Sequence, residues 1–198
     1  MFPAIKDFDA DILRPIHDIR GVLRKTKLGL TPPVADVIDS GYSPAATAIA
    51  KLFVETTENA LETDPMISIS ELCDRTLLSE KDVSDALYEL GNMVDGDYGI
   101  VMPTAELFVT FDKHFKDWDP AADALTIAAD LLNDAEVPKG PQQIAERYGW
   151  SPRQLNPAIA YLNGRKLISS LRHLGMGPWI AVHLEKTDAT RRFVSSRQ

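Results

Sequence analysis

Three polar side chains in the stretch SPRQLN, residues 151–156, have the chemistry needed to read the edges of DNA bases. An arginine such as Arg153 can form two hydrogen bonds to guanine, and Gln154 or Asn156 can do the same with adenine. More basic side chains follow, where they could contact phosphates: Arg165, Lys166, Arg172 and His173. These residues predict a surface for duplex DNA.

The sequence contains no comparable pattern for catalysis. It has no nucleophile motif, no glycine-rich phosphate loop and no cluster of metal ligands. The four histidines are scattered, and Asp95 and Asp97 lie in VDGDYG, where Asp-Gly favours a turn. The single cysteine, Cys73, is expected in a core. We therefore expect a binding protein that uses no cofactor or metal, and not an enzyme.

The charges of the chain are unevenly distributed. The net charge is −8 overall. Residues 1–40 carry six basic and six acidic side chains, residues 41–120 carry five and sixteen, and residues 121–198 carry ten and seven. These three parts therefore have net charges of 0, −11 and +3. Such polarity predicts that the middle and the last part have different partners.

An internal repeat indicates which elements position these side chains. SPAATAIAKLFVET, from residue 43, aligns with DPAADALTIAADLL, from residue 119. ELCDRTLLSEKDVSDALYELGNMV, from residue 71, aligns with QIAERYGWSPRQLNPAIAYLNGRKL, from residue 143. Similarity at a nearly fixed spacing indicates two copies of one structural unit.

Each copy has the same predicted order of elements. An opening helix is capped by Ser43 or Asp119 and has proline at its first position. A short helix follows at ISELCDRT or PQQIAERYG, and a third helix begins at Ser79 or Ser151. Pro157 predicts either a kink in the second copy's third helix or a later start to that helix. Residues 98–111 and 167–184 contain β-rich runs around turns, which predict hairpins.

The segment IAERYGWSPRQLNPAIAYLNGRKLI resembles the helix–turn–helix core of bacterial winged-helix proteins. That resemblance implies that the third helix of each copy is a recognition helix and that the hairpin is a wing. The expected fold class is mostly α with small β-hairpins (α+β), formed by two tandem winged-helix domains after an N-terminal helical extension. The expected domains are an extension at 1–40, an acidic domain at 41–118, a basic-faced domain at 119–185 and a tail at 186–198.

The sequence is compatible with two functions. In the first, the second domain binds duplex DNA as part of a transcriptional regulator, while the acidic first domain repels DNA and serves interaction or regulation. In the second, both domains bind only protein. Tandem acidic winged helices also resemble the adaptor subunits of chromosome-organising complexes, which bind protein partners.

The N-terminal part adds an expectation about self-association. The apolar residues Ile12, Ile16, Ile19 and Leu23 have the spacing of an amphipathic helix, which could pack on its own domain or form a homodimer seam. The chain has no secretory signal pattern and no apolar run of membrane-spanning length. With a single cysteine, these features predict a cytoplasmic protein that does not bind membranes.

Overall fold

The computed structural model describes residues 39–62, 64–171 and 177–197. From Asp39 onward the chain forms one compact unit. The predicted N-terminal helix, with Ile12, Ile16, Ile19 and Leu23, lies outside the described residues. The helical elements are α2 (Pro44–Thr56), α3 (Ile69–Thr76), α4 (Glu80–Leu90), the short 3-10 turn η2 (Gly91–Met93), α5 (Ala105–Phe115), α6 (Pro120–Asn133), α7 (Pro141–Tyr148), α8 (Pro152–Gly164) and α9 (Asp188–Ser195).

Local capping chemistry starts the helices where the sequence predicts. The Ser43 side chain accepts a hydrogen bond from the Ala46 amide at the start of α2, and Asp119 does the same for Ala121 at the start of α6. Ser79 and Ser151 cap α4 and α8 in the same way. Each side-chain oxygen satisfies one of the amides that a helix start leaves without a partner. These predicted starts are confirmed.

The strands of the described residues form two small antiparallel sheets. They are β1 (Ile67–Ser68), β2 (Val94–Asp97), β3 (Ile100–Pro103), β4 (Ile168–Leu171) and β5 (His183–Lys186). The first sheet has the order β1-β3-β2, and β4 pairs with β5 in the second. The predicted class, mostly α with small antiparallel hairpins, is confirmed.

The first predicted hairpin is displaced along the chain. Its turn is Tyr98-Gly99, between β2 and β3, and residues 105–115 form α5 instead of a second strand. The aromatic and β-branched residues of AELFVTF favour a strand, but Leu107, Phe108 and Phe111 recur at helical spacing and are fully buried. Burial of one helical face outweighs the strand propensity of the individual residues.

The second copy follows the predicted order more closely. β4 and β5 pair antiparallel, with Leu171 opposite His183. β4 lies inside the hairpin predicted at residues 167–184, and β5 extends two residues beyond it. Helix α8 runs without a break from Pro152 and includes Pro157, so the alternative of a helix that begins only near residue 156 is wrong. The C-terminal residues form α9, whose Phe193 and Val194 join the core of this copy.

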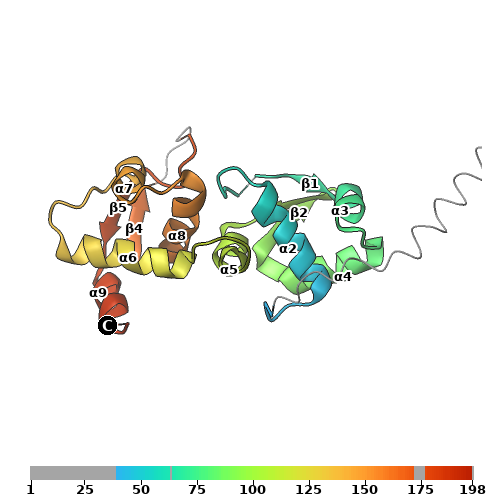
Figure 1. Cartoon of the computed structure of the whole chain (residues 1–198), viewed down its shortest axis with the longest axis horizontal. Coiled ribbons are helices and arrows are strands. Elements are labelled where there is room, and N and C mark those ends of the chain that lie inside the picture. Colours follow the sequence, from blue (N-terminus) through green and yellow to red (C-terminus); the bar gives the residue numbers. More distant parts are fainter. Residues whose placement is uncertain (1–38, 63, 172–176, 198) are drawn as a thin grey trace, which may run out of the picture. The chain divides into compact units, whose positions relative to one another are not determined.

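Each copy has its own hydrophobic core, and α5 belongs to both. Phe108 and Phe111 pack in the first core, whereas Val109 packs in the second. Helix α5 contacts α2 on one side and α8 on the other (Figure 1). Among the helices described, none combines the length and apolarity needed to span a lipid bilayer. The connecting helix α5 therefore determines what the neighbouring face of α8 can contact.

Candidate functional site

Arg153, predicted to face DNA, is buried against α5. Its Nη1 donates to Asp112 Oδ2 at 2.6 Å and its Nη2 donates to Asp112 Oδ1 at 2.7 Å. The guanidinium also lies 4.9 Å from the centre of the Phe108 ring. Burial raises the pKa of the Asp112 carboxyl, and the hydrogen bonds from Arg153 oppose that shift. Arg153 therefore joins the two copies, and its buried guanidinium is not accessible to a base.

Asn156 is fully buried at the same junction. Its Nδ2 donates to the Asn59 carbonyl at 2.8 Å and to the Pro178 carbonyl at 2.7 Å. Its Oδ1 accepts from the Ile180 amide at 3.0 Å. The side-chain amide thus uses both donor hydrogens and its acceptor inside the protein, and it connects three separate segments.

The prediction that Arg153 and Asn156 point outward is wrong. Gln154 is only half-buried, and its Nε2 donates to Asp123 Oδ2 at 2.9 Å. Arg153 faces α5, whose residues 105–111 were predicted to belong to a hairpin and which packs on α8. Asn156 instead faces the segments that contain Asn59 and Pro178. From Leu155 to Leu162 every residue of α8 is buried. A helix covered in this way cannot enter a DNA groove.

The remaining predicted phosphate contacts have a different environment. Arg165 and Lys166 are exposed just after α8, whereas Arg172 and His173 lie outside the described residues. The Arg165 guanidinium stacks 3.8 Å from the centre of the Tyr161 ring. Tyr161 packs on Phe193, with ring centres 6.1 Å apart, and Arg197 stacks 4.2 Å from the Phe193 ring. We call Arg165, Tyr161, Phe193 and Arg197 the arginine–aromatic ladder.

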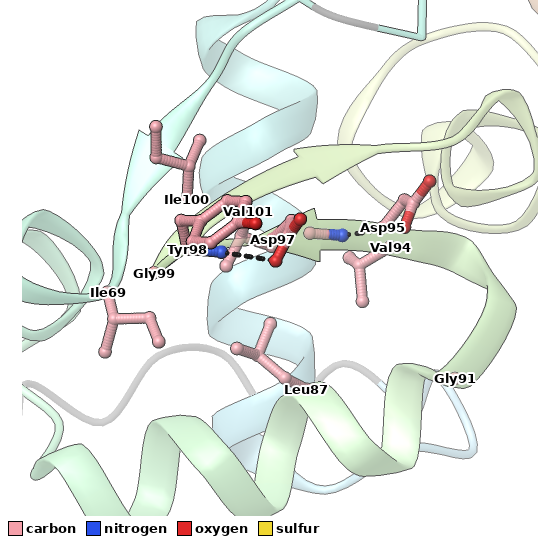
Figure 2. A pocket seen from close by; sticks show the side chains of 11 residues that line it. Ile69, Leu87, Gly91, Val94, Asp95, Asp97, Tyr98, Gly99, Ile100 and Val101 are labelled. Carbon is pink, nitrogen blue, oxygen red and sulfur yellow. Dashed lines mark hydrogen bonds between the residues drawn. The ribbon is translucent and has the colours of Figure 1, made fainter.

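The first copy contains an open groove between α4 and the β2–β3 hairpin, with a volume of about 390 Å³. Figure 2 shows Leu87 pointing from α4 toward the hairpin, Val94 pointing back toward α4, and Ile69 at one end. These three apolar side chains are only partly buried. Asp95, Asp97, Tyr98 and Ile100 line the hairpin side of what we call the α4–hairpin groove.

Tyr98 occupies an unusual position at the tip of the hairpin. Its φ is 51° and that of Gly99 is 79°, so both central residues of the turn are left-handed. Such hairpin turns favour Asn, Asp or Gly at the first of these positions. The Tyr98 side chain is 96% exposed, although Asp97 Oδ1 accepts a hydrogen bond from its amide at 2.8 Å. The fold therefore gains no packing from this tyrosine that would offset its backbone strain.

The groove has an acidic environment. Residues 80–101 contain six acidic side chains and one basic one, a net charge of −5. Among the described residues, no Lys or Arg pairs with Asp95 or Asp97. Asp95 Oδ1 accepts from the Gly96 amide, which reduces the capacity of this edge to pair with another strand. The groove therefore combines an apolar floor with an acidic rim.

The groove has little signature in the sequence. Its only local signal is the Tyr-Gly pair just before the β-rich residues IVMP, which indicates a tight turn with an exposed aromatic ring. The groove also depends on where α4 passes the hairpin, which is a tertiary relationship. A pattern within one segment cannot provide that information.

No set of His, Cys, Asp or Glu side chains in the described ranges is arranged to hold a metal ion. The polar groups near the groove are carboxylates, a phenol and backbone amides, without a nucleophile and base in contact. The chain matches no known family model and no curated protein.

Proposed function

We propose that this chain is a protein-interaction adaptor built from two winged-helix domains, with the α4–hairpin groove as its docking site. The order of elements supports the winged-helix assignment. In the first copy an opening helix, a short strand, two helices and a hairpin follow one another, and β1 pairs with β3. In the second copy the Leu184 amide donates to the Lys139 carbonyl at 2.9 Å, at the place where β1 would pair.

One observation carries the choice of an adaptor over a DNA reader: equivalent helices of the two copies have opposite exposure. Lys81, Asp82 and Ser84 on α4 are exposed. The aligned positions on α8 are Arg153, Gln154 and Asn156, of which the first and last are buried. The recognition helix with DNA-compatible residues is therefore covered, and the exposed one is acidic. Acidic faces repel phosphates and attract basic protein surfaces.

In-cell photo-crosslinking tests the adaptor proposal. A photoreactive amino acid replaces Tyr98 in the full chain, and a matched control places it at Gln143, which is exposed on α7. We expect covalent products with protein from position 98 and none from position 143. Equal labelling from both positions, or no protein product from position 98, would contradict the proposal.

DNA binding is the second candidate, and the arginine–aromatic ladder favours it. Stacked guanidinium groups keep their N–H edges available for phosphate oxygens, and Lys166 is exposed beside Arg165. If the protein binds DNA in this way, α8 has only a structural role, and the ladder contacts the DNA backbone without reading the base sequence.

A titration of the full chain with duplex DNA at low salt separates the two candidates. The adaptor proposal expects no binding. Binding that weakens steeply with added salt, and is lost when Arg165 and Arg197 are both replaced by Ala, would favour the second candidate.

A further inference from the structure

We infer that the α4–hairpin groove of one protein molecule binds the arginine–aromatic ladder of a second, identical molecule, head to tail. The inference rests on the proposed function, because it names the partner of the same docking groove. It follows from two complementary surfaces that one chain presents at the same time.

The ladder is an organised cationic surface. Arg165 and Arg197 stack on Tyr161 and Phe193, and these two rings also contact each other. Stacking restrains each guanidinium before any partner arrives, so less side-chain entropy is lost on binding. Arg165 donates to the Tyr161 carbonyl at 3.5 Å and shares an exposed, 3.6 Å ion pair with Glu106, and Arg197 donates to the Ser196 hydroxyl at 3.2 Å. Such an exposed ion pair is weak and can be exchanged for a better acceptor.

The groove supplies the matching acceptors and an apolar floor. Asp95 and Asp97 each use Oδ1 to hold a backbone amide of the hairpin. The guanidinium groups of a second protein molecule could therefore bind these carboxylates without competing with any described Lys or Arg. Tyr98 stands at the hairpin tip, where a large exposed ring can act as an anchor for an interface.

Charge determines which two surfaces meet. Two grooves facing each other would bring the Asp95 and Asp97 carboxylates of both molecules together, which disfavours a groove-to-groove contact. Both the groove and the cationic groups of the ladder are accessible in the single chain, so they do not occupy each other there. A contact between the groove of one molecule and the ladder of another brings opposite charges together. It leaves one groove and one ladder unfilled in each head-to-tail dimer.

Sedimentation velocity of the full chain tests the inference at about 50 mM and about 500 mM salt, because screening weakens contacts between exposed charges. We expect concentration-dependent association at low salt. Tyr98→Asn should weaken it by about tenfold or more, as expected for the loss of an interface anchor. Replacing Arg165 and Arg197 by Ala together should have a similar effect.

Two control variants show whether a loss is specific to the groove. Leu77→Gly removes the backbone strain of another non-glycine residue with a left-handed conformation in the same domain, and Leu77 does not line the groove. Tyr88→Gln removes another tyrosine, 90% exposed, that does not line it either. Both controls should associate like the original chain. If they lose association as Tyr98→Asn does, the inference is wrong.

Mixing the two defective variants gives a sharper result. The Tyr98→Asn chain keeps its ladder, and the Arg165→Ala, Arg197→Ala chain keeps its groove. A head-to-tail contact predicts that each variant alone is monomeric and that the mixture forms a one-to-one dimer that grows no further. A mixture that stays monomeric overturns the inference.

Other outcomes identify what the surfaces do instead. A full chain that is monomeric at low salt overturns the inference, and the adaptor proposal then stands only if position 98 crosslinks to a different protein. Association that survives both sets of substitutions belongs to another surface and also overturns it. A monomeric chain whose ladder variant alone loses DNA binding would assign the ladder to DNA.

Discussion

Arg153 and Asp112, 41 positions apart in the sequence, form a bidentate ion pair in which the Arg153 side chain is 9% exposed and the Asp112 side chain is fully buried. The pair connects α8 of the second copy to α5, and Arg153 Nη2 also donates to the Val54 carbonyl in α2 at 3.3 Å. The two copies are thereby connected through hydrogen-bonded charges as well as apolar packing.

The first prediction is that Arg153→Ala strongly destabilises the protein. The substitution leaves Asp112 buried without its cation, which typically costs about 3–5 kcal/mol. Urea unfolding of the variant should therefore show a large fall in the free energy of unfolding. A matched double variant, Arg153→Met with Asp112→Leu, removes both charges and should recover most of the loss. An Arg153→Ala protein of unchanged stability would show that the ion pair does not connect the copies.

The second prediction concerns Asn156 and the segments that it joins. Asn156→Ala leaves the buried Ile180 amide without its acceptor, and we expect a loss of about 2–3 kcal/mol. Gln143→Ala, at an exposed position, should change stability by less than about 0.5 kcal/mol. Thermal or urea unfolding measures both. Asn156→Asp should be at least as damaging as Asn156→Ala, because its second oxygen would face the Asn59 and Pro178 carbonyls.

Helix starts and fold class could be predicted from the sequence because they depend on neighbouring residues. Ser79 and Ser151 cap their helices through amides three residues away, and no distant contact is needed for this. The alternation of short helices with β-rich segments also depends on the residues within each segment and not on distant contacts.

The candidate site could not be predicted because burial depends on distant elements. Lys81 and Arg153 occupy aligned positions after serine caps, but one is exposed and the other is covered by α5. The polar residues of α8 matched those of a DNA reader, and the same chemistry also suits a buried junction. The two are distinguished by tertiary neighbours. Asp112, on a helix that overlaps the hairpin predicted at residues 98–111, pairs with Arg153. The carbonyls of Asn59 and Pro178 accept hydrogen bonds from Asn156.

The third prediction is a loss of stability in mildly acidic solution through His114. Burial, with a smaller effect from the Lys113 ammonium, holds the pKa of His114 below its ordinary value, and the Asp39 carboxylate opposes the shift. The unfolded chain therefore binds the proton more readily than the folded protein does. Stability should fall as the pH drops through about 6.5, the unfolded pKa of histidine, toward the lower pKa of the folded state.

His114→Gln removes this titration. The variant should lose less thermal stability than the original chain between about pH 7.5 and about pH 5.5. Melting curves of both proteins at the two pH values provide the measurement. Equal losses in the two proteins would mean that another group is responsible.

The fourth prediction compares equivalent turns in the two copies. Leu77, the C-cap residue after α3, has a φ of 59°, and the aligned Gly149, the C-cap residue after α7, has a φ of 70°. Both residues adopt the left-handed conformation that favours glycine. Leu77 is 62% exposed, so its side chain returns little packing energy for the strain of its backbone. Leu77→Gly should therefore stabilise the protein, by about 1 kcal/mol.

The reciprocal substitution supplies the test of this reasoning. Gly149→Leu places a branched side chain at the same conformation and should destabilise the protein by about 1–2 kcal/mol. No atom lies within 4 Å of a Cβ built on Gly149, so the loss would come from backbone strain and not from a clash. Urea unfolding of the two variants should give shifts of opposite sign. Shifts of the same sign would show that side-chain contacts, and not the left-handed backbone, determine which residue each turn prefers.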